Sequence, residues 1–287
     1  MNNITFRFVF FGTEPLASAV LNALEQKGFV PDLVVASADK IARDKSIIFP
    51  PEKTWAIARG IDVVQPKTIT SEFIAKLARS EWEIFVVASF GKILPKALLD
   101  IPRLGTINLH PSLLPHLRGP SPIRSAILED EKEIGVSVML LDDKMDHGEI
   151  IAQRDVATPE WPMHGKTLDA LLAQEGADLL TNVLPKWLEG AVKAKQQDHS
   201  QATYCKMFTK EQGLIDLTDD PHKNLLKIRA FEGWPGTYAF FSRNGGKIRV
   251  NIIDAHIENS ALIIDTVKPE GKREMKYGEF LRFIYAN

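Results

Sequence analysis

Three polar residues of this sequence have side chains that could together carry out acyl transfer: Asn108, His110 and Asp146. Asn108 and His110 lie two residues apart at the end of an apolar, strand-like run, and alternate side chains of a strand point to the same face. An amide offers N–H donors to a developing oxyanion, while an imidazole and a carboxylate can hold or move a proton. Because none of the three is a good covalent nucleophile here, the attacking group would be the substrate's own amine or a water.

Each of these residues also has an ordinary structural explanation. An asparagine or histidine at a strand end is commonly a hydrogen-bonded turn residue, and Asp146 stands before His147-Gly148 in a sequence typical of a turn. The spacing alone therefore leaves catalysis and a structural role both open. Metal binding is not predicted, because His110, His116 and His147 lack a standard ligand spacing and the chain has one cysteine, Cys205.

The elements that must hold these residues alternate between strand-like and helix-like patterns over residues 1–188, which predicts a Rossmann-like α/β fold with a mostly parallel sheet. Pro111 and Pro115 turn the chain away from the sheet directly after His110, and open α/β sheets bind ligands at such strand ends. Residues 38–50 are polar and basic and are predicted to form a surface loop. The predicted strands are 6–11, 32–37, 61–64, 83–89, 135–141 and 149–154, the last two as a hairpin or bent pair, and the predicted helices are 16–24, 51–59, 71–79, 96–99, 122–129 and 168–188.

Residues 189–203 are polar and weakly patterned, as expected of a linker between a first domain at 1–188 and a second at 204–287. After a predicted helix at 222–231, the second domain has short strand-like runs without helices between them, which favours a small antiparallel β-barrel of the OB type. These strands are predicted at 237–241, 247–256, 261–267 and 277–283.

Length and composition bound the class of protein. A chain of 287 residues is long enough for two domains, and a formal net charge of −2 gives no global attraction to nucleic acid or to an anionic membrane. The single cysteine excludes an internal disulfide framework and fits a reducing compartment. No apolar run approaches the ~18 residues of a membrane span, and residues 1–11 do not resemble a signal peptide. A cytoplasmic protein is therefore expected.

Several short blocks occur along the chain in a fixed order. In the first domain the blocks are FFGT at 10–13, SFGKILP at 89–95, NLHPSLLP at 108–115, RG at 118–119, GVS at 135–137 and MDHG at 145–148. In the second they are TY at 203–204, KEQGLID at 210–216, IRAF at 228–231 and WPGT at 234–237. In this order they resemble the formyltransferases that use 10-formyltetrahydrofolate, the members acting on methionyl-tRNA in particular. Agreement of several spaced blocks is more specific than any one motif.

The resemblance implies transfer of a formyl group from 10-formyltetrahydrofolate to the α-amino group of methionine on initiator tRNA, by direct attack of the amine through a tetrahedral intermediate. It implies that Asn108 and His110 stabilise the oxyanion, and that Asp146 pairs with His110 and assists removal of the amine proton. No metal is implied. The residues implied to bind the folate co-substrate are Ser89, Phe90, Gly91, Ile93, Leu94, Ser112, Leu113, Leu114, Pro115, Leu141 and Asp142.

The resemblance further implies that the second domain holds the acceptor arm of tRNA, chiefly through phosphate contacts, and that Lys40, Arg43 and Lys45 of the 38–50 loop bind RNA. This loop is shorter and less basic than is typical of the family. An alternative acceptor therefore stays open, an amino-sugar nucleotide formylated by a sugar N-formyltransferase with the same donor. A third possibility is an RNA-binding or regulatory protein without catalysis, against which the intact catalytic set argues. The protein is predicted to be a monomer that acts away from membranes.

Overall fold

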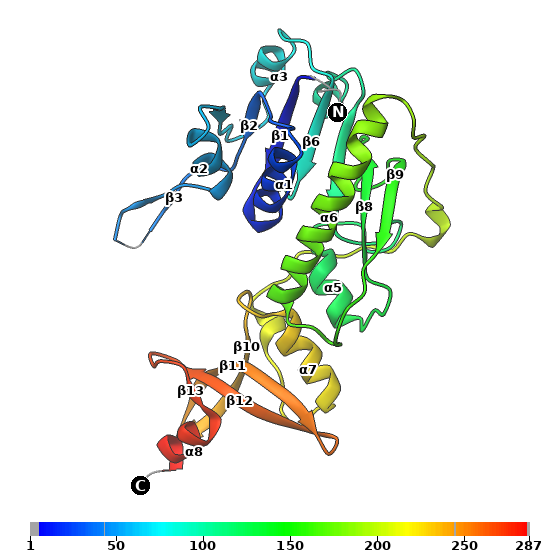
Figure 1. Cartoon of the computed structure of the whole chain (residues 1–287). Helices are drawn as coiled ribbons and strands as arrows, with labels where there is room; N and C mark the ends of the chain where they lie inside the picture. The colour runs from blue at the N-terminus through cyan, green and yellow to red at the C-terminus, as the bar shows by residue number, and fades with distance from the viewer. Residues whose placement is uncertain (1–5, 43, 244, 286–287) are drawn as a thin grey trace. The chain divides into compact units, whose positions relative to one another are not determined.

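The computed structural model of the chain describes residues 6–42, 44–243 and 245–285 (Figure 1). Its contacts divide the chain into two compact units. The first comprises residues 1–120, 133–157 and 169–204, and the second residues 121–132, 158–168 and 205–287. The expected domains at 1–188 and 204–287 are contiguous, whereas these units interleave along the chain. The contiguous boundaries stay a prediction, which limited proteolysis would test.

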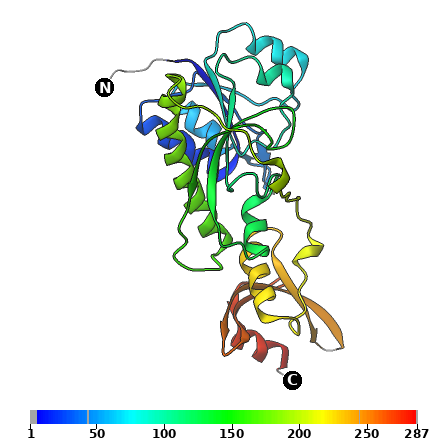
Figure 2. The same cartoon turned by 90° about the vertical axis from the view of Figure 1, so that its right-hand side faces the viewer.

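The first unit is built on a seven-stranded sheet (Figures 1 and 2). Its strands are β1 (Phe8–Gly12), β2 (Leu33–Val35), β5 (Asp62–Val64), β6 (Ile84–Ala88), β7 (Thr106–His110), β8 (Gly135–Leu140) and β9 (Ile150–Asp155). They lie in the order β5-β2-β1-β6-β7-β8-β9. The first five strands in this order are parallel, whereas β8 is antiparallel to β7 and β9 to β8. The Rossmann-like, mostly parallel fold is thereby confirmed.

The central strands β1 and β6 are buried along their whole length, as expected of parallel strands whose two faces are covered by helices. One apolar cluster joins Phe11 of β1 and Phe85 of β6 to Leu77 and Leu98 of two helices. Burial of these side chains is the main stabilising contribution on this face of the sheet. The helices of the first unit are α1 (Glu14–Gln26), α2 (Pro51–Ile57), α3 (Ser71–Leu77), α4 (Lys96–Leu99) and most of α6 (Gly165–Leu188).

Helix α6 packs directly against β7, the strand that ends in His110. Gly176 permits this approach, because a Cβ there would come within 2.8 Å of the Leu109 side chain.

In the sheet, β1 lies between β2 and β6, so the chain runs outward to β2 and β5 on one side and then to β6 and β7 on the other. The carboxyl ends of β1 and β6 therefore meet at a topological switch point, where open α/β sheets bind ligands.

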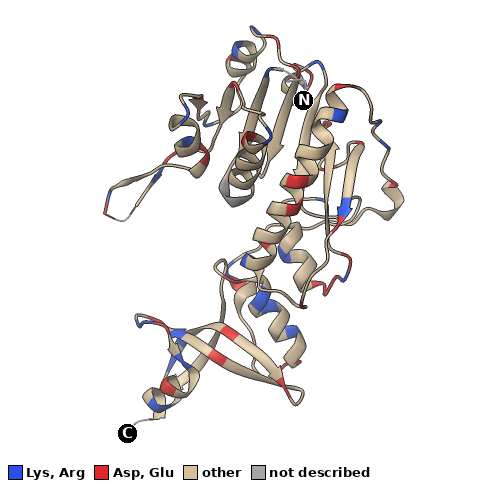
Figure 3. Cartoon of the chain, in the orientation of Figure 1, with Lys and Arg blue, Asp and Glu red and all other residues tan. Residues whose placement is uncertain are grey.

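The segment at 38–50, predicted as a surface loop, contains a small antiparallel hairpin of β3 (Lys40–Ile41) and β4 (Ile47–Ile48). It exposes apolar as well as basic side chains. Ile41 is 76% exposed and Ile47 63% exposed, and Lys45 has a positive φ of 67° in the turn. Figure 3 shows the Lys and Arg positions of the chain, those of this hairpin included, in blue. The segment thus combines charge with exposed apolar area, a pairing that a solvated connection does not require.

The second unit contains a four-stranded antiparallel sheet in the order β10-β11-β12-β13, which fits the small OB-like domain expected. The predicted strand at 277–283 is wrong, because this segment is helix α8. Phe280 and Ile284 are buried four residues apart, a spacing that puts both on one face of a helix. The elements are α5 (Pro122–Leu128), α7 (Pro221–Ala230), β10 (Thr237–Arg243), β11 (Gly246–Glu258), β12 (Ala261–Pro269), β13 (Met275–Lys276) and α8 (Tyr277–Tyr285).

The Asp130 carboxylate accepts hydrogen bonds from residues of all three chain segments of the second unit. The donors are Lys132 Nζ at 2.7 Å, Trp161 Nε1 at 2.7 Å and His222 Nε2 at 3.2 Å. Burial alone would raise the pKa of Asp130, but these hydrogen bonds outweigh burial and lower the pKa to about 2. The folded unit therefore favours the ionised carboxylate.

Residues 189–203, predicted as a linker, pack onto the first unit. Lys195 pairs with Ile150 at the start of β9, and Gln197 is only 5% exposed. A short 3₁₀ helix follows at His199–Gln201. This polar segment therefore contributes ordered side chains to the unit that carries Asn108 and His110. No helix among the described residues is long and apolar enough to cross a bilayer.

Candidate active site

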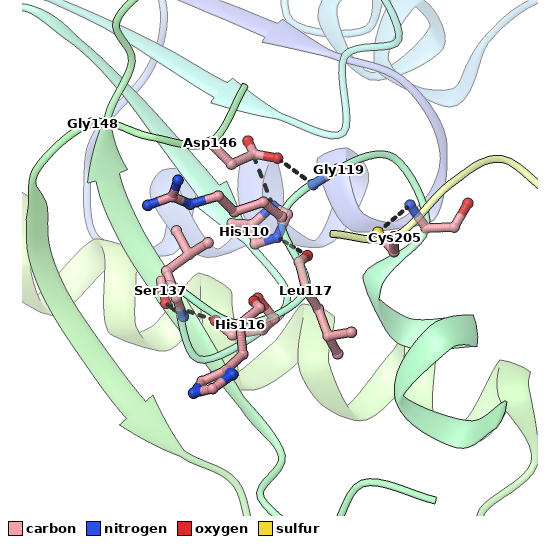
Figure 4. A network of polar contacts seen from close by, with 12 residues as sticks. His110, His116, Leu117, Gly119, Ser137, Asp146, Gly148 and Cys205 are labelled. Atoms are coloured by element: carbon pink, nitrogen blue, oxygen red, sulfur yellow. Dashed lines mark hydrogen bonds and ion pairs between the residues drawn. The ribbon is translucent and has the colours of Figure 1, made fainter. Parts of the chain in front are cut away.

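His110 lies buried at the end of β7, and its two ring nitrogens have different neighbours (Figure 4). Nε2 is 3.0 Å from the carbonyl oxygen of Leu117. Because a carbonyl can only accept, Nε2 carries a hydrogen and donates it. Nδ1 faces Asp146, at 3.8 Å from Oδ1. A second proton, on Nδ1, would make His110 an imidazolium directly beside that carboxylate.

The carboxylate of Asp146 is held from its other side. Oδ2 accepts a hydrogen bond from the backbone N–H of Gly119 at 2.7 Å, which fixes the side chain toward His110 (Figure 4). Asp146 has a φ of 47° and Leu117 a φ of 56°, both in the left-handed region that L-residues rarely adopt. Such strain persists only where surrounding contacts enforce it, and it gathers at functional sites.

Asn108 shares the face of β7 with His110, because the two are separated by one residue of the strand. Its Cα partner on β8 is Met139, and the residue is partly exposed. The structure therefore places His110 of β7 against Asp146 of the loop between β8 and β9, with Asn108 on the same face of β7 as His110. The loop closes tightly at Gly148, where a Cβ would lie 2.0 Å from the carbonyl oxygen of Leu140.

The loop after β7, predicted to line the folate site, is anchored by two residues of the neighbouring strands. Ser137 Oγ donates to the carbonyl of Ser112 at 2.6 Å and accepts from the N–H of Leu114 at 3.1 Å. Gln153 Nε2 donates to the carbonyl of Leu114 at 2.7 Å. These contacts fix the backbone from Ser112 to Pro115. Sequence reasoning found the loop and the GVS block but did not assign this role to Ser137 or Gln153.

The other residues predicted to bind folate fall into two groups. Leu94 belongs to the apolar cluster of the first unit, and Phe90 from the same block and Leu141 from a distant one pack against it. The exposed group comprises Ser89, Gly91 and Ile93, of which Ile93 is 90% exposed. The structure thus brings these three side chains into one apolar cluster beside the ends of β6 and β8, and leaves the Ile93 side chain outside it.

A cavity of about 540 Å³ lies beside the β8–β9 loop. Leu141 and Asp142 line it, whereas the other predicted folate residues do not. Its remaining walls include Thr106, Arg103, Gln197 and His199. Asp142 accepts a hydrogen bond from His147 Nδ1 at 2.6 Å. These walls come from the start of β7 and from the 189–204 segment, which sequence reasoning did not connect to the site.

Arg118 is a buried polar residue to which the sequence assigned no role, although it lies in the RG block at 118–119. It is 1% exposed. Its guanidinium donates twice to Gln197 Oε1, at 3.1 and 2.6 Å, and once to Tyr204 Oη at 3.2 Å. It lies 2.9 Å from His199 Nδ1, which must accept because arginine only donates. Nothing in the polar sequence around Gln197 signals such a partner.

His199 stacks on His147, with ring centroids 3.9 Å apart and planes at 9°. Desolvation lowers the pKa of His199, and the nearby charges of His147 and Arg118 act in the same direction. A neutral His199 keeps Nδ1 free to accept from Arg118.

The predicted RNA-binding residues Lys40 and Lys45 both lie on the β3–β4 hairpin. Arg43 lies outside the described residues. Within 6–42, 44–243 and 245–285, no group of three or more His, Cys, Asp or Glu side chains could hold a metal ion.

Comparison with known proteins bears on the family and the fold. The formyl transferase family matches residues 6–184 of the chain. A methionyl-tRNA formyltransferase of Chloroflexus aurantiacus is 41% identical over 98% of each chain. In fold, the chain is similar to a methionyl-tRNA formyltransferase from Clostridium thermocellum, with 19% identity and a TM-score of 0.60 over 92% of this chain and 99% of that one.

The fold is also similar to that of an N-formyltransferase from Helicobacter canadensis in complex with folinic acid and dTDP-3-aminofucose, with 17% identity and a TM-score of 0.64. That match covers 95% of this chain and 99% of the other. At such identities the solved structures establish the fold alone. The family match over residues 6–184, together with a relative 41% identical over nearly the whole chain, means that this protein belongs to the formyl transferase family.

Proposed function

We propose that the protein transfers a formyl group from 10-formyltetrahydrofolate to the α-amino group of methionine on initiator methionyl-tRNA. The observation that carries this proposal is the contact of His110 with Asp146 at the end of β7, with Asn108 on the same face of the strand, beside a loop held in place by Ser137. Similarity to a methionyl-tRNA formyltransferase over 98% of the chain supports the choice of acceptor, because it extends through both units.

The reaction is a direct transfer. The amine attacks the formyl carbon, the carbonyl oxygen becomes an oxyanion, and the bond from that carbon to N10 of the folate then breaks. The proton lost by the amine ends on N10. Asn108 supplies amide donors to the oxyanion. His110 supplies positive charge and its Nδ1–H, since Nε2–H is already donated to Leu117 and the 3.8 Å to Asp146 is too long for a hydrogen bond.

Asp146 has two roles in this proposal. It stabilises the imidazolium of His110, and it accepts or relays the proton that leaves the attacking amine. Its φ of 47° and its hydrogen bond from Gly119 hold the carboxylate in place before substrate binds. Such preorganisation avoids rearrangement of the site at the moment of reaction.

The folate co-substrate supplies the formyl group, and the residues near the site suit its chemistry. Phe90, Leu94 and Leu141 offer apolar area for a flat heterocycle, and the backbone of the Ser112–Pro115 loop is already fixed. Asp142, at the start of the β8–β9 loop, adds a carboxylate beside them. We propose that these residues hold the folate, and that no metal takes part.

Two surfaces suit a tRNA acceptor. The β3–β4 hairpin of the first unit carries Lys40 and Lys45 together with exposed isoleucines. In the second unit, Arg249 stacks on Tyr238 with its guanidinium carbon 3.7 Å from the ring centroid, and Phe240, opposite Arg249 in the sheet, is 52% exposed. Cations neutralise phosphates, and aromatic rings stack on unpaired bases.

One assay tests the proposed function. The purified protein is incubated with 10-formyltetrahydrofolate and one of three acceptors: methionylated initiator tRNA, the same tRNA without methionine, or an amino-sugar nucleotide. We expect formylation of the methionylated tRNA alone, because only that acceptor presents the methionine amine. Turnover on the sugar without turnover on the charged tRNA would replace this proposal by the sugar N-formyltransferase alternative.

The hairpin is tested by Lys45→Ala, with Lys27→Ala on an exposed position after α1 as the matched control. If Lys45 contacts a phosphate, its loss reduces the slope of log affinity against log salt by about 1. An unchanged slope would show that this lysine does not touch the tRNA backbone.

We further propose that the protein acts as a monomer in the cytoplasm, and sedimentation at micromolar concentration tests the oligomeric state.

A further inference from the structure

We propose that Gln197 is a positioning residue for Asp146: its buried side-chain amide, from the 189–203 segment of the first unit, fixes both the backbone of the β8–β9 loop (the catalytic loop) and the peptide that binds the Asp146 carboxylate. The inference rests on the proposed function, in which Asp146 is catalytic. It assigns a part in the reaction to a segment that by its sequence is only a connection.

The first half of the observation is the contact with the catalytic loop. Gln197 Nε2 donates to the carbonyl of Asp146 at 2.9 Å and to the carbonyl of Gly148 at 2.7 Å. Both N–H groups of the amide are therefore used on carbonyls that flank His147. At 5% exposure, Gln197 meets little competition from water for these bonds. The two bonds hold the backbone where Asp146 adopts its φ of 47°.

The second half is the contact with Arg118. Gln197 Oε1 accepts from Arg118 Nε at 3.1 Å and from Nη2 at 2.6 Å. Arg118 directly precedes Gly119, whose N–H donates to Asp146 Oδ2 at 2.7 Å. The position of that N–H follows from where Arg118 is held. Gln197 therefore acts on both ends of Asp146, its main chain and its carboxylate.

Glutamine is the side chain that this position requires. The site needs two donors for two carbonyls and one acceptor oxygen for a guanidinium, which is the full hydrogen-bonding capacity of a primary amide. Glutamate would keep the oxygen facing Arg118 but place a second oxygen against the carbonyls of Asp146 and Gly148. Methionine would match the length and lose every bond. Because the position requires two N–H donors and an acceptor oxygen, the role of Gln197 is more specific than packing alone.

Adjacent contacts explain how the segment stays in register. Thr203 Oγ1 accepts from the N–H of Leu117 at 2.8 Å, and the carbonyl of Thr203 accepts from the N–H of Arg118 at 2.9 Å. The Leu117 carbonyl is the one that binds His110 Nε2. The 197–203 stretch thus lies against the backbone that holds His110 as well as the backbone that holds Asp146.

The test is a double-mutant cycle on the full chain, measured as single-turnover formyl transfer to methionylated initiator tRNA. Gln197→Ala is made in the wild type and in an Asp146→Ala background, with Gln201→Ala, an exposed glutamine of the same segment, as the matched control. In the wild type we expect Gln197→Ala to lower the rate about 10- to 100-fold, the size seen when a supporting contact lets a reacting group move. The apparent KM for the folate donor should stay within about twofold, because the hydrogen bonds of Gln197 go to Arg118, Asp146 and Gly148 and to none of the residues proposed to hold the folate.

The effect of Gln197→Ala on the rate of the Asp146→Ala variant distinguishes a positioning role from a general structural role. If Gln197 acts through Asp146, its substitution has no further effect once that carboxylate is gone. An equal loss in both backgrounds would mean a general structural role and would overturn the inference, as would an unchanged rate in the wild type. Should Gln197→Ala fail to fold, Gln197→Glu replaces it, since it keeps the oxygen for Arg118 and removes both donors.

The cycle also separates this inference from the proposed function. A wild-type rate for Asp146→Ala alone would remove the catalytic role of Asp146. A slow Asp146→Ala together with a fully active Gln197→Ala would leave the proposed function standing and reject only the positioning role.

Discussion

Replacing Asp146 with asparagine removes the charge of the carboxylate and nearly keeps its shape. The amide oxygen can still accept from the N–H of Gly119, so the loop has no reason to move. What is lost is the attraction between a negative charge and the imidazolium of His110, together with the carboxylate that would take the proton of the attacking amine. At the 3.8 Å between Oδ1 and Nδ1, a pair of unit charges is worth about 4 kcal/mol at an effective dielectric constant of ~20.

That dielectric constant applies because the His110 and Asp146 side chains are only 5% and 15% exposed. If the transition state contains the imidazolium, loss of the charge pair alone lowers the rate by about 10³-fold, so Asp146→Asn should lower it by at least that factor. The assay is single-turnover formyl transfer, with folate binding measured separately and expected to be unchanged. Asp143→Asn, an exposed carboxylate of the same loop, is the matched control. A rate for Asp146→Asn within tenfold of the wild type would show that the reaction does not depend on a charged His110–Asp146 pair.

Three further outcomes follow from the contacts described. Asn108→Ala should lose about 10²- to 10³-fold in rate with folate still bound, as for removal of one oxyanion donor; a near-wild-type rate would end that assignment. Gly148→Ala should destabilise the fold by about 1–3 kcal/mol in urea unfolding, because the new Cβ would meet the rigid Leu140 carbonyl, whereas Gly278→Ala, with open space around it, should not. Asp130 should make stability depend on acid: its folded pKa of about 2 is below the unfolded 3.8, so its stabilising contribution is present above pH 3.8 and is lost as the pH falls toward 2. Asp130→Asn should flatten that part of the pH profile of unfolding.

The strands of the first unit could be predicted because burial on both faces demands continuous apolar runs, and 84–88 is such a run. The segment at 277–285 shows the limit of that reasoning. Its aromatic and branched residues favour a strand by composition, whereas the burial of Phe280 and Ile284 follows the spacing of a helix. In so short an apolar segment the two periodicities compete, and packing against the β10–β13 sheet decides between them.

The sequence predicted which apolar residues would bind the folate, but it could not predict that they lie together in the fold. Phe90 and Leu94 follow β6, and Leu141 follows β8, and they meet because β7 is the single strand between β6 and β8. Strand order is a long-range property, so no local pattern contains it. Ile93, in the same block, is 90% exposed.

By itself the sequence determined that Asn108 and His110 share a face, because the alternation of side chains along a strand is a local property of the backbone. Only the tertiary structure decided that Asp146 faces Nδ1 of His110 and that Leu117 takes the hydrogen of Nε2. Only the tertiary structure placed Gln197 between Arg118 and the catalytic loop. The physical reason is that hydrogen bonds between distant segments depend on where whole elements pack, and a polar segment without periodicity gives no sign of its partners.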